Sequence, residues 1–318
     1  MRALNVLFRS SVALPFMAAI AAAAHDLDAG PADAPGWTFD LWIVLPLAAS
    51  ALLFTIGWMR LQRRSHRHVG RWRRRAWLFA GGWGVVAGAL VSPLHAAGER
   101  SFTAHMLEHE LLMLLGAPLL VLAEPLVVML WALPATLRLS VAGLFANGMA
   151  RRLWSRATEP FTATVLQAAA LWIWHAPALF DRALQSDAWH VAQHLSFLLS
   201  ALLFWSAMLH RSGAPTGALS AAGSGSQAVR SVAALCLFVT SLVSGALGGL
   251  MAMSQSPWYA GYARLGLAPF GLTPAEDQQL AGLLMWIPGG LVHAGVALAL
   301  VRDVFTLNTA GRRGSDAT

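Results

Sequence analysis

Seven apolar stretches of near-bilayer length follow one another along the chain, and they constrain its fold more than any other feature. A helix needs about 20 apolar residues to cross the hydrocarbon core, where it satisfies its own backbone hydrogen bonds. The stretches lack the alternating pattern of barrel strands. The sequence therefore predicts an all-α, polytopic membrane helix bundle of about seven transmembrane helices. The expected spans are Leu41–Met59, Ala76–Val91, Phe102–Leu122, Phe161–His175, His190–Leu209, Ser231–Met253 and Gln278–Val301.

Composition excludes two other classes of protein. With 57% hydrophobic and 12% charged residues and a mean hydropathy of +0.57, the chain is too apolar for a soluble domain of 318 residues. Its net charge of +7 comes from arginines that lie between the apolar stretches and form no single basic face, which argues against nucleic-acid binding. Cys236 is the only cysteine, so disulfides and paired-thiolate metal sites are excluded.

The two ends of the chain predict segments outside the bundle. Residues 1–24 carry two arginines, an apolar run and small residues before position 25, which is typical of a signal peptide; an uncleaved anchor is the alternative. Residues 25–40 form an acidic leader, expected on the extracytoplasmic side. We expect a transmembrane domain over residues 41–303 and a cytoplasmic tail over residues 304–318.

The arginines predict how the bundle is oriented. Eight of them lie between Arg60 and Arg75, so this linker belongs in the cytoplasm by the positive-inside rule. Alternation of seven spans then puts 17 arginines inside and only Arg100, Arg182 and Arg264 outside. This favours a multi-pass membrane protein with its N-terminus extracytoplasmic and its C-terminus cytoplasmic. A further apolar stretch, Pro125–Leu133, is too short to span and is expected to re-enter or lie at the interface.

Two histidine pairs lie at the outer ends of two predicted spans. His105 and His109 begin the third span, and His190 and His194 begin the fifth. An i,i+4 spacing places both imidazoles of a pair on one helix face, so two such helices can offer four nitrogens to one metal ion. Ionisable groups within a span are costly and usually face the bundle interior with a partner. We therefore expect the two pairs to converge.

Further candidate ligands lie close to these pairs. Met113 continues the stripe of His105 and His109 by one more i,i+4 step, and His175 ends the fourth span on the same side. Thioether and imidazole ligands together suit copper, although zinc is possible from the ligand types. Glu108 and Glu110 flank His109 near the start of the helix, where negative charge is favourable and a carboxylate could orient an imidazole as an outer acceptor.

Other polar residues have simpler interpretations. Thr273 and Pro274 predict a helix start, with Glu276 and Asp277 favourably placed in its first turn. His95 is expected in the first outer loop.

Several short sequence motifs are spread over the chain between about Trp72 and Val301. They contain His105, Met106, His109, Leu111–Met113, Ala117–Leu120, Trp174, His175, Pro177, His194, Phe204, Trp205, Pro257–Tyr259, Asp277–Gly282, Met285 and Trp286. Together these motifs resemble the CtaG-type cytochrome c oxidase assembly factors, a family of polytopic bacterial membrane proteins, and the combination is more specific than any one motif. The resemblance implies a place in the bacterial inner membrane and a role in maturing haem–copper oxidases at the step of copper acquisition, with an oxidase subunit as partner.

Two other functions stay open at this stage. Histidines on facing helices could ligate a b-type haem. A copper permease would need polar groups that continue inward, for which Met285 and His293 are the only hints. No nucleotide-binding loop or hydrolase constellation is present, so we do not expect an enzyme. The expected function is oxidase assembly through extracytoplasmic copper handling.

Overall fold

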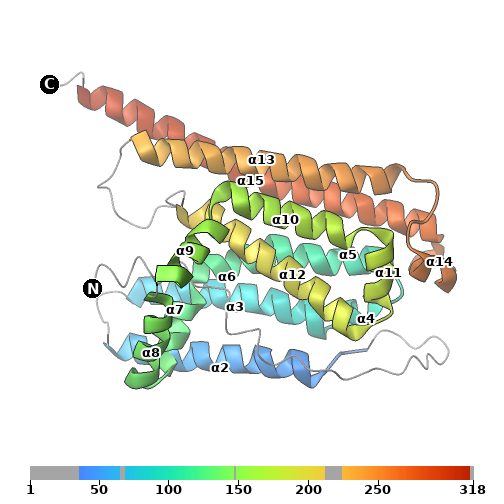
Figure 1. Cartoon of the computed structure of the whole chain (residues 1–318), viewed down its shortest axis with the longest axis horizontal. Coiled ribbons are helices and arrows are strands. Elements are labelled where there is room, and N and C mark those ends of the chain that lie inside the picture. Colours follow the sequence, from blue (N-terminus) through green and yellow to red (C-terminus); the bar gives the residue numbers. More distant parts are fainter. Residues whose placement is uncertain (1–35, 65–68, 147, 212–223, 316–318) are drawn as a thin grey trace.

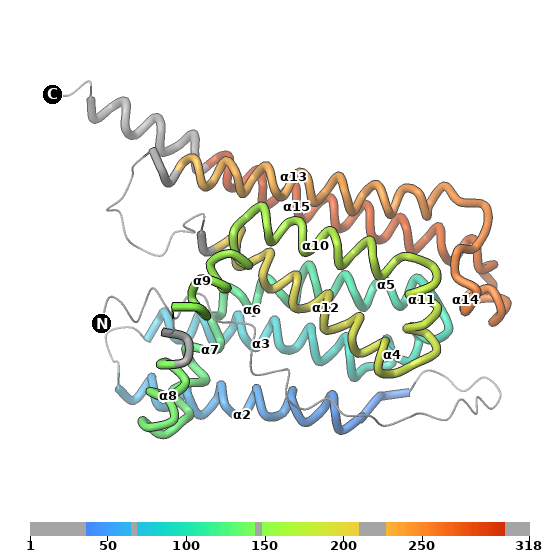
Figure 2. Tube along the Cα trace, viewed as in Figure 1, coloured from blue at the N-terminus to red at the C-terminus, as the bar shows by residue number. Residues whose placement is uncertain are grey.

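The computed structural model describes residues 36–64, 69–146, 148–211 and 224–315, and Figure 2 draws the remainder in grey. The predicted signal peptide and most of the acidic leader lie outside the described residues. All regular secondary structure in the described part of the chain is helical, and that part contains no strand. This confirms the all-α prediction.

Seven long helical segments lie side by side in one bundle (Figure 1). Each corresponds to one of the apolar stretches of the sequence. The segments are α2 (Leu41–Arg64), α3 (Val69–Val91), α5–η2–α6 (Phe102–Glu110, Leu111–Gly116, Ala117–Ala123), α10 (Pro160–Trp174), α12 with η4 (Asp187–Ser206, Ala207–Arg211), α13 (Ser224–Met253) and α15 (Pro274–Ser315). α15 thus continues as a helix into the expected tail, as far as Ser315.

Short helices lie at the two ends of the bundle (Figure 1). One end, called here the α4/α14 end, carries α4 (Pro93–Gly98), α11 (Pro177–Leu184), α14 (Ala260–Leu265) and η5 (Pro269–Gly271). The other, called the α8/α9 end, carries α7 (Pro125–Met129), η3 (Leu130–Ala132), α8 (Ala135–Ala146) and α9 (Gly148–Ala157). The short apolar stretch of the sequence therefore forms α7 and η3, which pack against α2.

The predicted count of seven spans is not confirmed. Within the described residues, five helical segments are long and apolar enough to cross a membrane: α2, α5 to α6, α12, α13 and α15. A sixth arises if α10 and α11 count as one broken span bent by 73°. α3 is not apolar enough to count as a span because its first turns carry four arginines. α10 alone is too short to count, because it has only 15 residues. The chain is nevertheless a multi-pass membrane protein.

Arginines gather at one of the two ends of the bundle. Arg60 lies in the last turns of α2, Arg75 lies in the first turns of α3, and Arg151 lies in α9, all at the α8/α9 end. Arg75 forms an ion pair of 2.5 Å with Glu124, and Arg60 donates to the carbonyls of Trp131 and Ala132. The α8/α9 end is therefore the arginine-rich end.

Helices α13 and α15 lie in close contact where both carry glycine. A Cβ atom built on Gly282 would lie 2.5 Å from the carbonyl oxygen of Gly248, and one built on Gly248 would lie 2.7 Å from that of Gly282. Such distances leave no room for a side chain. Small residues that let two backbones touch are a usual means of helix association in membranes. This contact fixes α15 against the bundle.

Candidate metal centre

Helix α5, which carries the first histidine pair, is held at its beginning by a carboxylate from another helix. Ser101 is the N-cap residue and accepts from the backbone N–H of Ala104. Asp277, in the first turn of α15, accepts hydrogen bonds from the hydroxyl of Ser101 and from the N–H of Phe102, at 2.9 and 2.6 Å. A negative charge at a helix N-terminus is favourable. These bonds fix where the helix starts and hence where His105 lies.

The structure brings all four paired histidines together at the α4/α14 end. Nε2 of His194 lies 3.3 Å from Nε2 of His109 and 3.0 Å from Nε2 of His190. The rings of His105 and His190 stack with centroids 5.4 Å apart. One nitrogen each from His105, His109 and His194 can be chosen so that all lie within 4.8 Å of one another. We call these four residues the histidine cluster.

The nitrogen spacing in the histidine cluster is that of ligands around one ion. Four ligands at about 2.0–2.1 Å from a tetrahedral metal ion lie roughly 3.3 Å from one another. An imidazole nitrogen carries either one hydrogen or one lone pair, so Nε2 of His194 cannot form regular hydrogen bonds with both neighbours at once. A cation bound by one nitrogen each of His105, His109 and His194, which lie within 4.8 Å of one another, would need no such hydrogens. The arrangement is thus suited chemically to a metal.

The buried carboxylate of Glu108 lies beside the imidazole nitrogens of two histidines at the site. Oε1 of Glu108 lies 2.8 Å from Nδ1 of His95 and 3.6 Å from Nδ1 of His194. A proton on Nδ1 of His194 would be attracted to this carboxylate, which leaves the lone pair on Nε2. Burial alone would lower the pKa of His95, but the hydrogen bond and charge of Glu108 raise it above its ordinary value. Glu108 therefore orients two imidazoles.

His95 is a fifth histidine at the site, and sequence analysis did not include it among the ligands. It lies in α4, whose N-cap is Ser92 with Pro93 at the first position. Its ring stacks on that of His190 with centroids 5.6 Å apart. The short α4 turns the chain back toward α5, so a residue expected in a loop is buried beside the histidine cluster. The helix-start signal at Ser92 and Pro93 could have located α4, but it does not give the direction of the turn.

His175 faces a methionine. Its Nδ1 lies 2.7 Å from the carbonyl oxygen of Leu171, and its Nε2 lies 3.4 Å from Sδ of Met106. The rings of Phe180 and Phe197 each pack against His175 and against one member of the histidine cluster. His175 therefore lies close to the histidine cluster, with its free nitrogen toward Met106, which sequence analysis did not single out as a ligand.

Met113 lies further along the same segment, within a π-helical turn. A π-helical turn changes the register of the residues that follow it, so the i,i+4 stripe from His109 does not continue regularly. Sδ of Met113 lies 3.5 Å from Nε2 of Gln167, and its carbonyl oxygen accepts a hydrogen bond from the indole of Trp205. The structure thus directs Met113 toward α10 and α12.

The remaining candidates of the sequence lie apart from the histidine cluster. Met285 is buried in α15, and His293 lies two turns further along that helix, where its ring stacks on Trp205 with centroids 5.8 Å apart.

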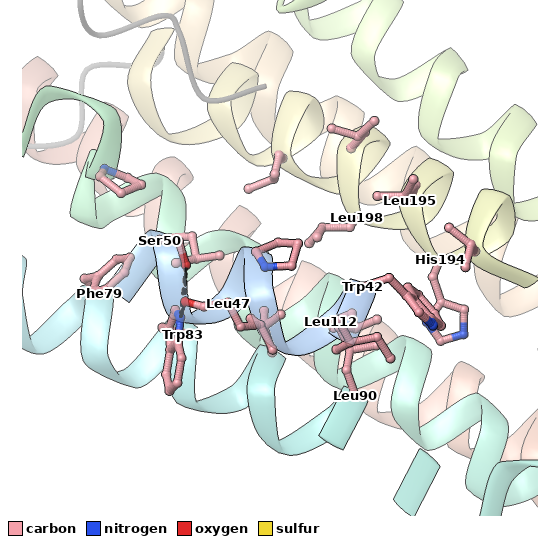
Figure 3. Close-up of a pocket in the computed structure, with 18 of the residues that line it drawn as sticks. Trp42, Leu47, Ser50, Phe79, Trp83, Leu90, Leu112, His194, Leu195 and Leu198 are labelled. Atoms are coloured by element: carbon pink, nitrogen blue, oxygen red, sulfur yellow. Dashed lines mark hydrogen bonds between the residues drawn. The ribbon is translucent and has the colours of Figure 1, made fainter. Parts of the chain in front are cut away.

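An apolar groove leads to the histidine cluster (Figure 3). It has a volume of about 160 Å³ and is lined chiefly by aliphatic and aromatic side chains of α2, α3 and α12. Figure 3 shows His194 beside Trp42 at one end of this lining. His95 and His190 line the groove as well. One side of the histidine cluster therefore faces open space, which gives an ion or a partner a route to it.

Comparison with known proteins agrees with the resemblance seen in the sequence. No curated protein matches the chain significantly, and no solved structure does. The sequence model of one family, described as cytochrome c oxidase caa3 assembly factor, matches residues 52–306. That range contains α3 to α14 entirely, and with them the histidine cluster, His95, Glu108 and His175. Because the match covers most of the chain, the protein belongs to the cytochrome c oxidase caa3 assembly factor (Caa3_CtaG) family.

Proposed function

We propose that this assembly factor binds a copper ion at the histidine cluster, on the extracytoplasmic side of the membrane, and passes it to a subunit of the oxidase. The observation that supports the proposal is the convergence of the histidine cluster: one nitrogen each from His105, His109 and His194 lies within 4.8 Å of the others, and Nε2 of His190 lies 3.0 Å from Nε2 of His194. Membership of the family supports an oxidase as the partner. The packed helices of the bundle hold the histidine cluster in a fixed position within the membrane.

The ligand set favours copper among the metals of oxidases. Imidazole binds copper in either oxidation state, and divalent copper binds nitrogen sites more tightly than the other divalent first-row metals. His105 and His109 are almost fully buried, whereas His190 and His194 are half-buried and line the groove. A bound ion would thus be held from the protein side and exchanged from the groove side. This is the arrangement of a delivery site, and it requires no catalysis.

The same distances disfavour a b-type haem. Two axial histidines bind opposite faces of a flat macrocycle, so their nitrogens lie roughly 4 Å apart with the porphyrin between them. In the histidine cluster, Nε2 of His194 contacts its neighbours directly at 3.0 and 3.3 Å. No macrocycle fits between atoms in contact. We therefore propose direct metal binding as the function of these residues.

The proposed orientation follows from the arginines. The α8/α9 end carries most of the described arginines, and cytoplasmic ends of membrane proteins are enriched in basic residues. The histidine cluster at the opposite end would then face the extracytoplasmic side. In a Cys236→Ser background, an impermeant maleimide should label a cysteine placed at Glu99 in intact cells, and one placed at Arg138 only after lysis. The reverse pattern would contradict this orientation.

The proposed function is tested by metal content and oxidase activity together. His109→Ala and His194→Ala should lower the copper bound per purified protein and the cytochrome c oxidase activity of membranes, while the protein still accumulates. His66→Ala, in the arginine-rich linker, is the matched control and should leave both unchanged. Oxidase activity at the wild-type level in both cluster variants would refute the proposal.

A further inference from the structure

The hydrogen bond of His175 determines which of its nitrogens carries the proton. A backbone carbonyl can only accept, so Nδ1 at 2.7 Å from the oxygen of Leu171 must be the donor. His175 is buried, and within the described part of the chain no carboxylate pairs with it, so a second proton would leave an uncompensated buried charge. Nε2 therefore carries a lone pair. This lone pair points at the thioether of Met106.

Two electron-pair donors then face each other without a hydrogen between them. A thioether sulfur is only a weak acceptor, so a deprotonated Nε2 gains nothing from Sδ of Met106 at 3.4 Å. A metal ion between them would accept both electron pairs, so that the nitrogen and the sulfur would each gain a bond. With bonds of about 2.0 Å to nitrogen and about 2.3 Å to sulfur, a separation of 3.4 Å corresponds to an angle of roughly 105° at the metal. This is close to the angle of a tetrahedral or trigonal site.

The surroundings of this pair are apolar and contain a second thioether. Met106 and Phe180 are almost fully buried. The hydroxyl of Tyr259 donates to the backbone oxygen of His175 at 3.1 Å and lies 3.8 Å from Sδ of Met251, so a second buried thioether lies near the backbone of His175. Thioether ligands select soft ions such as Cu(I), and an uncharged ligand set in an apolar site favours a single positive charge over two.

We propose that Nε2 of His175 and Sδ of Met106 form a second metal site, selective for a soft monovalent cation of the Cu(I) class. It lies between α5 and the bend from α10 to α11, separated from the histidine cluster by the rings of Phe180 and Phe197. The site goes beyond the proposed function, because it neither requires nor excludes copper at the histidine cluster. It gives the protein two neighbouring sites of different ligand type.

The test uses Ag(I), which resembles Cu(I) in its ligand preference but undergoes no redox change. Met106→Leu replaces the thioether by an apolar side chain of similar volume, so the bundle should still fold. Changes to outer-shell residues alone typically cost about 10–100-fold in metal affinity, so removal of a direct ligand should weaken Ag(I) binding by roughly tenfold or more. Met113→Leu is the matched control, because Met113 lies in the same helical segment but contacts Gln167. It should bind Ag(I) as the wild type does.

A parallel titration with Co(II), a spectroscopic probe for nitrogen sites, separates this proposal from the previous one. Met106→Leu should leave Co(II) binding unchanged, and His109→Ala should weaken it while Ag(I) binding to the second site persists. If His109→Ala leaves Co(II) binding intact but Met106→Leu weakens Ag(I) binding, the histidine cluster fails as a metal site and the second site stands. Ag(I) affinity that is unchanged in Met106→Leu, or equally reduced in Met113→Leu, would overturn the second site.

Discussion

Replacement of Glu108 by glutamine tests the architecture of the histidine cluster without removing a ligand. The variant keeps the size of the side chain but loses the negative charge that lies 2.8 Å from His95 and 3.6 Å from Nδ1 of His194. The amide can still accept a hydrogen bond through its oxygen, but it no longer raises the basicity of the imidazole. We therefore expect weaker metal binding in a protein that still folds.

The magnitude follows from the role of the carboxylate. Loss of a partner that orients a ligating histidine typically costs about 10–100-fold in metal affinity, equivalent to about 1.4–2.8 kcal/mol. Glu108 touches two imidazoles, so the upper half of this range is expected. The affinity for copper would be measured by competition with a chelator of known strength, on protein purified in detergent, with thermal unfolding recorded in parallel.

Glu110 provides a matched control on the same helix. Oε2 of Glu110 is buried like Oε2 of Glu108, and neither atom has a hydrogen-bond partner among the described residues. Glu110, however, forms no ion pair with a histidine in that part of the chain. Glu110→Gln should therefore bind copper as the wild type does. Unchanged affinity in Glu108→Gln, or an equal loss in both variants, would refute the reasoning.

Three further predictions follow from the contacts described above. Asp277→Ala should destabilise the protein by about 1–3 kcal/mol, because N–H and hydroxyl groups at the start of α5 lose their acceptor; a lower midpoint of thermal unfolding checks this. Gly282→Ala should reduce the amount of folded protein in membranes, because its Cβ would meet the backbone of Gly248, whereas Gly295→Ala, with nothing within 4 Å, should not. Chelation of copper from the wild type should lower its thermal midpoint, and the same treatment should leave the midpoint of His194→Ala unchanged.

Much of the fold follows from patterns that act over short distances along the chain. The apolar stretches predict where the long helices lie, and the i,i+4 spacing of His105 and His109 predicts their common face. The arginines predict the two unlike ends of the bundle. The span count is less certain from sequence, because α3 mixes arginines with apolar residues and α10 breaks after 15 residues.

The parts of the site that sequence analysis missed depend on how segments turn and meet. His95 reaches the histidine cluster only because α4 folds back onto α5, which no periodicity indicates. Asp277 lies in the first turn of its own helix as expected, yet its carboxylate caps α5, which begins 175 residues earlier. Met113 lies within a π-helical turn, so its predicted alignment with His109 rests on a regular α-helix that the segment does not keep. Contacts of this kind are set by packing between helices.

Copper K-edge X-ray absorption tests the central claim most directly. The measurement uses purified Met106→Leu protein loaded with one equivalent of copper, so that the proposed second site does not contribute sulfur. We expect a shell of three or four nitrogen neighbours at about 2.0 Å with the outer-shell scattering of imidazole rings, lost in the additional variant His194→Ala. A copper spectrum without an imidazole contribution, or one that His194→Ala leaves unchanged, would contradict it.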